Sequence, residues 1–225
     1  MKFRHLPLAL LVLPVLVLLA APIVGNAKGN AEAGATIAAT CGACHGAPGA
    51  NSTNPEWPNL AGQNANYIAH QLHMQHNAMR TSKPGDPNPL VMVAQAGMLD
   101  DQQIQDVAAY FSTLAPAGLE APATGTDVGR KLYHWGDRNK GVPACAACHG
   151  PVGHGNPAAG YPALRAQQSV YVLKQLNNYA ADARYTLNEK GASNGGEYAS
   201  IMHTIAMRLS DDEKASLAAY VQGMR

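Results

Sequence analysis

The sequence predicts an all-α protein built from two similar helical domains. An internal repeat runs through most of the chain, and apolar residues recur at helical spacing with no convincing strand alternation. Of the 225 residues, 47% are hydrophobic but only 6% are aromatic, so two domains would have thin cores unless a non-protein group fills them. The formal net charge of +1 gives no global attraction to nucleic acid.

Residues 1–27 are typical of an export signal. Lys2 and Arg4 form a basic start, an apolar run follows over 6–21, and small residues at 25–27 offer a cleavage site. The alternative is a retained membrane anchor, although this run contains two prolines and is short for a membrane span of about 20 residues. In either case we expect the rest of the chain outside the cytoplasm, most simply in a bacterial periplasm.

The remainder of the chain contains one unit twice. A Cys-x-x-Cys-His-Gly motif begins at Cys41 and recurs 104 positions later at Cys145, and the same offset carries Pro58 onto Pro162. Towards the end of each copy, an Ala-Ala-Tyr triplet recurs at an offset of 110, so the second copy has six extra residues. We place this insertion in the polar stretch 186–197.

The two copies predict two domains and a linker. The segment between the copies is rich in proline, glycine and alanine, as semi-extended linkers are. We expect a first domain over 28–114, the linker over 115–126 and a second domain over 127–225.

Each copy reads as helical. Residues 31–40 and 66–79 predict two helices of the first copy, and apolar residues at i, i+3, i+4 and i+7 predict a closing helix after them. Asp100 and Ser210 are candidate N-caps of the two closing helices.

The four cysteines indicate the chemistry. All of them lie in two Cys-x-x-Cys-His motifs, namely Cys41, Cys44 and His45, and Cys145, Cys148 and His149. Four cysteines are too few for a disulfide framework, and the pairs of a zinc site usually lie roughly 15–20 residues apart, whereas about 100 separate these. A thioredoxin-like redox pair needs a βαβ context that is absent. The adjacent histidine predicts two covalently bound haem c groups, each held by two thioethers and an axial histidine.

A second axial ligand is expected on the other face of each iron. The offset of 110 carries Met92 onto Met202, and both lie eight residues before the N-cap of a closing helix. Met98 and Met207 have no methionine partner under this offset, and we expect them to fill gaps in the core. We therefore assign Met92 and Met202 as the distal ligands.

Histidines outside the motifs suggest alternatives. His70, His73 and His76 form a near-stripe on the second helix, which a metal site or bis-histidine ligation would explain. The second copy lacks these histidines, so we favour a solvated face or a face at the haem edge. His134 and His154 have no counterparts either, and we expect them at the surface.

The axial histidines also need a hydrogen-bond acceptor for their other ring nitrogen. Pro58 and Pro162 each follow their histidine by 13 residues and begin a Pro-x-Leu segment that can wrap the haem edge and offer a backbone carbonyl. Leu60 and Leu164 would then pack on the porphyrin. The alternative is an ordinary proline turn.

These motifs resemble those of a class I cytochrome c domain, occurring twice. The tandem arrangement resembles the dihaem cytochrome c4 family from residue 31 to 223, through the haem motifs, the Pro-x-Leu segments, two Tyr-x-x-x-Gln-Leu pairs and the Ala-Ala-Tyr closures. The resemblance implies proline carbonyls that accept from the proximal histidines, distal methionines, and domains that pack face to face with haem propionates near the interface. The second copy departs from the pattern with Arg165 and Ala166 where the first has Ala61 and Gly62, which bears on the loop contacts and not on the ligation.

Histidine and methionine together saturate an iron and leave no position for a substrate. The sequence therefore predicts an electron carrier and not an enzyme. Residues 28–118 hold three basic and six acidic side chains, a balance of −3, whereas residues 127–225 hold eleven and eight, a balance of +3. We expect this charge asymmetry to orient docking.

The resemblance implies redox proteins as partners. A terminal oxidase is the expected acceptor and an upstream cytochrome or a cupredoxin the expected donor, with peripheral association with membrane complexes. Two alternatives remain. The chain could be the cytochrome subunit of a larger dehydrogenase, such as flavocytochrome sulfide dehydrogenase, or, less favoured, a dihaem peroxidase or thiosulfate-oxidising enzyme.

Overall fold

The computed structural model describes residues 29–81, 90–122, 124–184 and 196–224. The expected export signal lies outside the described residues, as does most of the expected insertion at 186–197. In the described part of the chain, the regular structure is helical apart from two isolated β-bridges, Asp137 with Val142 and Asn156 with Tyr161. None of the helices described there is long and apolar enough to cross a membrane.

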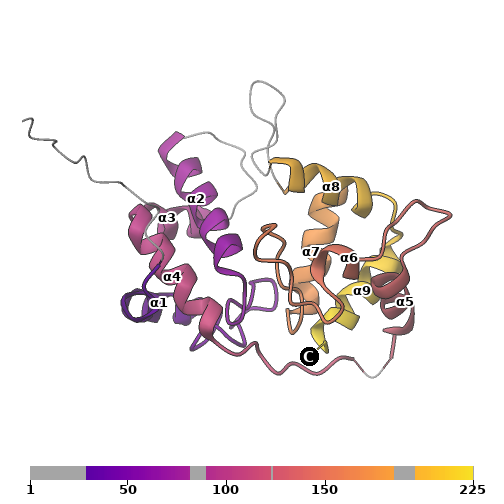
Figure 1. Ribbon diagram of the computed structural model, residues 1–225, viewed down its shortest axis with the longest axis horizontal. Coiled ribbons are helices and arrows are strands. Elements are labelled where there is room, and N and C mark those ends of the chain that lie inside the picture. Colours follow the sequence, from indigo (N-terminus) through magenta and orange to yellow (C-terminus); the bar gives the residue numbers. More distant parts are fainter. Residues whose placement is uncertain (1–28, 82–89, 123, 185–195, 225) are drawn as a thin grey trace, which may run out of the picture.

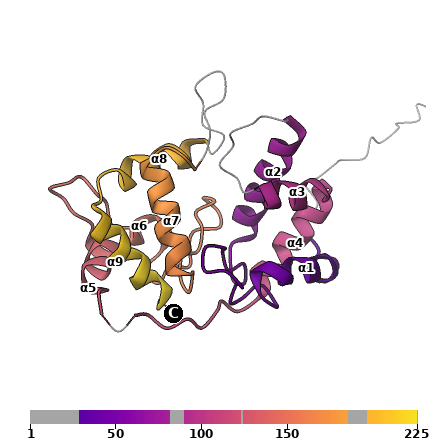
Figure 2. The same cartoon turned by 180° about the vertical axis from the view of Figure 1, so that it is seen from behind.

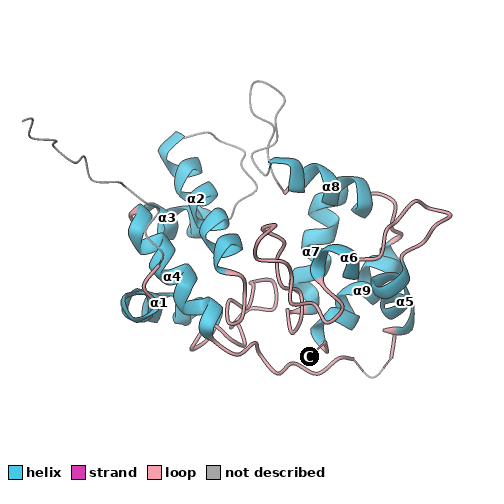
Figure 3. Ribbon diagram, viewed as in Figure 1, coloured by secondary structure: helices cyan, strands magenta, loops and turns pink. Residues whose placement is uncertain are grey.

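The helices form two sets that lie side by side (Figures 1 and 2). The first set comprises α1 (Ala31–His45), α2 (Ala65–Thr81), α3 (Leu90–Gly97) and α4 (Asp101–Thr113). The second comprises α5 (Asp127–Trp135), α6 (Ala146–His149), α7 (Ser169–Ala180), α8 (Gly196–Ala206) and α9 (Asp211–Gln222). The segment between α4 and α5 runs along one edge of both sets, and the loops gather between them (Figure 3). This is the all-α, two-domain architecture that the repeat predicts.

The opening helix differs between the domains. In the first, Asn30 caps α1 by accepting hydrogen bonds from the backbone nitrogens of Glu32 and Ala33, and the helix continues through the whole cysteine motif to His45. In the second, the chain leaves α5 at Gly136, whose φ of 66° lies in the left-handed region. The cysteine motif there is carried by the separate short helix α6.

The opening and closing helices of each domain cross at short range. A Cβ on Gly34 would collide with the carbonyl oxygen of Asp106, and a Cβ on Gly129 would collide with that of Ser216. Asp106 Oδ1 also accepts from the Asn30 nitrogen at 2.7 Å, and Ser216 Oγ accepts from the Gly129 nitrogen at 2.8 Å. Since Asp106 and Ser216 are equivalent positions, both domains fix the same crossing by the same kind of contact.

The closing helices begin where the sequence predicts. Asp100 accepts from the backbone nitrogen of Gln103 at 2.8 Å, and Ser210 accepts from that of Glu213 at 3.3 Å, each within a full capping box. The apolar face of α4 then enters the first core, with Ile104, Val107, Ala108 and Phe111 buried. In the second core, α9 contributes Leu217 and Val221.

Candidate haem centres

The histidine of each motif is buried and hydrogen-bonded to a proline carbonyl. His45 is 5% exposed and its Nδ1 lies 2.7 Å from the carbonyl oxygen of Pro58, while His149 is 8% exposed and its Nδ1 lies 2.9 Å from that of Pro162. A carbonyl only accepts, so Nδ1 carries the proton and Nε2 is left with its lone pair. Both rings are thus oriented as metal ligands that bind through Nε2.

The same burial keeps the imidazoles neutral. Loss of hydration lowers the pKa of His45 and of His149, and the hydrogen bond to the proline carbonyl offsets this in part. A neutral imidazole is the form that coordinates iron. The buried surroundings of His45 and His149 therefore favour the neutral, metal-binding form of each imidazole over the charged form.

The cysteines occupy the turn before each histidine. In both motifs the two cysteines are three residues apart and half-buried, and none of the four forms a disulfide. Burial raises the pKa of Cys41, and it raises the pKa of Cys145 to about 11. A reactive redox cysteine has a lowered pKa, so these thiols do not resemble a thioredoxin-like pair.

The other candidate haem-contacting residues border the buried core of each domain. Cys41, Leu60 and Met92 all border the buried core of the first domain. In the second domain, Cys145 and Leu164 border the equivalent core. The residues present fit haem c: two thiols, a neutral oriented imidazole and apolar side chains converge in each domain.

The two candidate distal methionines sit on equivalent helices. Met92 is half-buried on α3, and Met202 is half-buried on α8, which packs on α7. The expectation that Met98 and Met207 fill core gaps is wrong, because their side chains are 68% and 60% exposed. Each follows the last residue of α3 or α8 and lies in the turn that leads to the closing helix, outside the packed face.

The histidine stripe on α2 is only partly a solvated face. His70 is exposed as expected. His73 is half-buried, and its Nε2 lies 3.3 Å from Nε2 of Gln105. His76 is 5% exposed and its Nδ1 lies 3.0 Å from the carbonyl oxygen of Ala96, so the expectation of a solvated face is wrong for His76. This contact ties α2 to the last turn of α3. Among the described residues, no group of three or more histidine, cysteine or acidic side chains forms a metal site.

The second domain uses a different histidine for the same purpose. Nδ1 of His203, on α8, lies 2.7 Å from the carbonyl oxygen of Tyr179 at the end of α7. Sequence comparison between the copies missed this role, because His76 is on the second helix of its domain and His203 is on the helix that carries the candidate methionine. The one feature that could have predicted this role is a histidine whose ring can reach the end of a neighbouring helix. The sequence does not show which helices are neighbours, so this feature could not be used.

The remaining histidines, His134 and His154, have different surroundings. His154 is exposed, as expected. His134 is not a plain surface residue: it is partly buried, and its Nε2 lies 2.8 Å from the hydroxyl of Tyr220. It therefore links α5 to the closing helix α9.

The departure at Arg165 and Ala166 leaves the loop contact intact. Gly62 and Ala166 both have positive φ, 73° and 55°. The Gly62 nitrogen donates to the carbonyl oxygen of Phe111 at 2.9 Å, and the Ala166 nitrogen donates to that of the equivalent Val221 at 3.1 Å. Ala166 thus adopts a backbone conformation that glycine adopts more easily, because the closing helix offers the same acceptor.

Comparisons with known proteins agree with this geometry. The family model described as cytochrome c matches residues 31–115 and 129–225. Cytochrome c4 of Azotobacter vinelandii is 39% identical over 204 residues, which cover 88% of this chain and 91% of that protein. A thiosulfate dehydrogenase electron acceptor of Thiomonas intermedia is 35% identical over 189 residues, covering 82% and 78%. The crystal structure of reduced recombinant cytochrome c4 from Pseudomonas stutzeri superposes with a TM-score of 0.76 at 37% identity, covering 88% of this chain and 100% of that one.

Proposed function

Because the chain belongs to the cytochrome c family, in its dihaem cytochrome c4 branch, and carries two covalent haem c groups, we propose that it moves electrons through two His/Met-ligated irons in the periplasm. Its general role as a cytochrome electron carrier follows from the family. The ligand set, the compartment and the partners are the proposal.

The paired hydrogen bonds from His45 to Pro58 and from His149 to Pro162 carry this proposal. They orient each imidazole, and the position of Met92 and Met202 on equivalent helices supports the proposal that these methionines would supply the sixth ligand. Bound haem supplies one-electron redox chemistry at an iron that needs little rearrangement between its oxidation states. The four cysteines would hold the porphyrin edges by thioethers, and Leu60 and Leu164 would cover them.

A redox titration and a small iron-binding ligand test whether the protein fills both axial positions of each iron. A potentiometric titration of the holoprotein followed by visible absorption should count two haems and give two midpoint potentials. Carbon monoxide added to the reduced protein at neutral pH should leave the spectrum unchanged, because both iron faces are occupied. Binding of carbon monoxide by the native protein would favour a dihaem enzyme instead.

The periplasmic assignment is supported by the order of basic, apolar and small residues over 1–27. We infer that the mature chain begins near Lys28 and contains domains over 28–114 and 127–225, which the family matches over 31–115 and 129–225 support. The mass of the protein recovered from a periplasmic fraction tests this, since a retained anchor would leave the full-length mass in the membrane fraction.

A second candidate function is electron acceptance from a specific dehydrogenase. The similarity to thiosulfate dehydrogenase electron acceptors favours it, and it stands beside transfer from a cytochrome or cupredoxin donor to a terminal oxidase. Stopped-flow reduction by a purified thiosulfate dehydrogenase would distinguish them: rapid reduction favours the dedicated acceptor, and slow reduction favours the general shuttle. The same assay with a flavocytochrome sulfide dehydrogenase flavoprotein tests the subunit alternative.

A further inference from the structure

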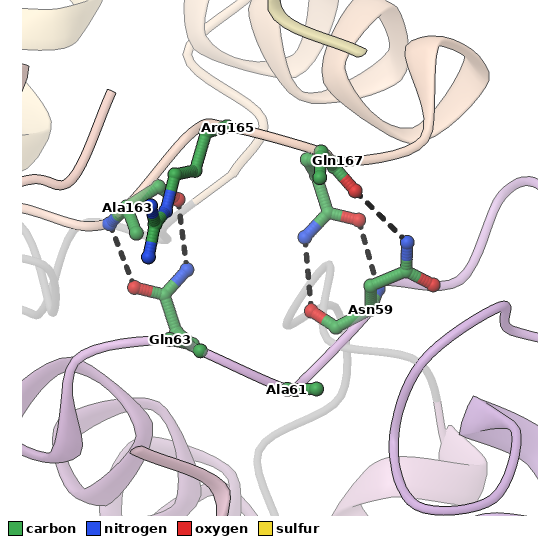
Figure 4. Close-up of a pocket in the computed structure, with 8 residues that line it drawn as sticks. Asn59, Ala61, Gln63, Ala163, Arg165 and Gln167 are labelled. Carbon is green, nitrogen blue, oxygen red and sulfur yellow. Dashed lines mark hydrogen bonds between the residues drawn. The ribbon is translucent and has the colours of Figure 1, made fainter. Parts of the chain in front are cut away.

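Two buried glutamines reach across the domain boundary and bind the backbone of the opposite domain (Figure 4). Gln63 accepts from the Ala163 nitrogen at 2.7 Å and donates to the Ala163 carbonyl at 2.9 Å. Gln167 accepts from the Asn59 nitrogen at 2.8 Å and donates to the Asn59 carbonyl at 3.0 Å. The two glutamines are equivalent in the repeat, and so are their targets, so the contact has local two-fold character.

The nitrogens that these glutamines bind belong to the peptide groups beside the axial histidines. The Pro58 carbonyl and the Asn59 nitrogen form one peptide group, so that group accepts from His45 and donates to Gln167. In the other domain, the peptide group that links Pro162 to Ala163 accepts from His149 and donates to Gln63. Each proximal histidine is therefore connected, through one peptide group, to a glutamine of the other domain.

A peptide group transmits polarisation between its two ends, because its nitrogen and carbonyl share electrons by resonance. Donation by the N–H to an acceptor increases the negative charge on the carbonyl oxygen and strengthens it as an acceptor, and burial makes this cooperative effect larger. A stronger acceptor for Nδ1–H makes the imidazole a better electron donor to a metal. That change stabilises the ferric state and lowers the reduction potential.

The side-chain oxygen of each glutamine also accepts a hydrogen bond within its own domain. Gln63 Oε1 also accepts from the backbone nitrogen of Asn64 at 2.9 Å, and Gln167 Oε1 accepts from that of Gln168 at 3.0 Å. Each side-chain oxygen thus has two donors, one across the domain boundary and one from the next residue of its own domain.

We propose that Gln167 sets the reduction potential of the first haem and that Gln63 sets that of the second, each acting across the domain boundary on a proximal histidine. The glutamines are positioning residues that act through the peptide group. The proposal rests on the proposed ligation by His45 and His149. It also implies that opening the domain interface would change both potentials, because both peptide groups lose their cross-domain acceptor.

Paired substitutions in the holoprotein test the proposal. Gln167→Met and Gln63→Met keep the side-chain length and remove both cross-domain hydrogen bonds, together with the one from the following backbone nitrogen. Gln167→Met should raise the midpoint potential of the first haem, with the ratio of ferrous to ferric iron at a fixed ambient potential rising about two- to threefold. The second haem should be unchanged. Gln63→Met should give the converse, and in each variant the NMR resonance of the affected histidine Nδ1–H should move upfield as its hydrogen bond weakens.

A matched control separates tuning from loosening of the interface. Asn66 Nδ2 donates to the Pro157 carbonyl at 2.9 Å across the same boundary and touches neither peptide group, so Asn66→Ala should leave both potentials unchanged. If a methionine variant does not yield folded holoprotein, Gln167→Asn and Gln63→Asn withdraw the amide by one methylene and give the same prediction.

The decisive result is that substitution of a glutamine in one domain shifts the potential of the haem in the other domain. Unchanged potentials, a shift only in the haem of the substituted domain, or equal shifts that Asn66→Ala reproduces would each overturn the proposal. Failure of the proposed function is distinguishable, because it would appear in the unsubstituted protein as a missing haem or as an iron that binds carbon monoxide.

Discussion

Nδ1 of His203 lies 2.7 Å from the carbonyl oxygen of Tyr179, which ties the helix of the candidate ligand Met202 to the end of the preceding helix. His76 makes the corresponding contact in the first domain from the opposite helix, with Ala96 as its acceptor. Each methionine-bearing helix is thus anchored by one histidine. The two domains therefore restrain the methionine-bearing helix in the same way, although the two histidines are at different positions of the repeat.

Removing this anchor should weaken the second domain. We expect His203→Ala to lower the free energy of unfolding by about 1 kcal/mol, since it removes one hydrogen bond and leaves a partly buried carbonyl without that donor. Denaturant unfolding of the holoprotein measures the change. His70→Ala, at an exposed position on α2, is the control and should stay within roughly 0.5 kcal/mol of the native value. Equal losses in the two variants would contradict the anchoring role.

Replacement of single methionines should separate ligands from surface residues. Met92→Ala and Met202→Ala should each lose the sulfur-to-iron charge-transfer band of one ferric haem, lower one midpoint potential and allow one haem to bind carbon monoxide. Met98→Ala and Met207→Ala remove exposed side chains and should leave spectrum and potentials unchanged. Loss of the band in Met98→Ala or Met207→Ala would show that the ligands are assigned to the wrong positions.

The short crossing of the opening and closing helices should be intolerant of a methyl group. Gly129→Ala places a Cβ against the carbonyl oxygen of Ser216, and we expect it to cost about 2 kcal/mol of stability or more. A Cβ on Gly118 would meet no other atom within 4 Å, so Gly118→Ala should have little effect. Thermal unfolding of both variants checks this prediction, and a native melting temperature for Gly129→Ala would refute it.

A buried tyrosine should limit stability at alkaline pH. Tyr133 is fully buried and donates to the carbonyl oxygen of Gly150 at 2.6 Å, and burial raises the pKa of its hydroxyl well above the ordinary value of about 10. The unfolded chain loses this proton first as the pH rises, so the free energy of unfolding should fall above about pH 10. Tyr133→Phe should be less stable near pH 8 but should show a shallower decline between about pH 9 and pH 11. Parallel curves for the two proteins would rule out this contribution.

The positive charge of the second domain should govern its reaction with charged redox agents. Lys131 and Arg138 are both exposed there. The double variant Lys131→Glu, Arg138→Glu should react more slowly with anionic hexacyanoferrate(III) and faster with a cationic ruthenium ammine. At high ionic strength both rates should converge on the native values, because salt screens surface charges over about 3 Å at 1 M. Rates that do not depend on the substitution at low salt would remove electrostatic docking from the proposed function.

Local patterns predicted the parts of the site that are close in sequence. The histidine and the proline carbonyl are 13 residues apart in both domains, and the capping boxes of α4 and α9 span only three residues. Contacts of this kind depend on residue type and short spacing. Comparison of the two copies selected Met92 and Met202 as the candidate ligands, which stays a prediction, and it misjudged the surroundings of Met98 and Met207.

Contacts between distant segments escaped prediction. His76 binds a carbonyl 20 residues away, and Gln167 binds a backbone nitrogen 108 residues away. Neither partner offers a distinctive side chain, because both contacts use backbone groups that every residue possesses. A glutamine in a loop is therefore indistinguishable in the sequence from any solvated glutamine.

By itself, the sequence determined that this is a duplicated helical protein with two covalent haem groups, because cysteine spacing, caps and helical periodicity act within one or a few turns. Only the tertiary structure decided which side chains cross between domains and which histidines anchor a helix. The physical reason is that a hydrogen bond to a backbone group is specified by the position of that group in space. The packing of Gly34 and Gly129 against the closing helices, and of one domain against the other, sets those positions.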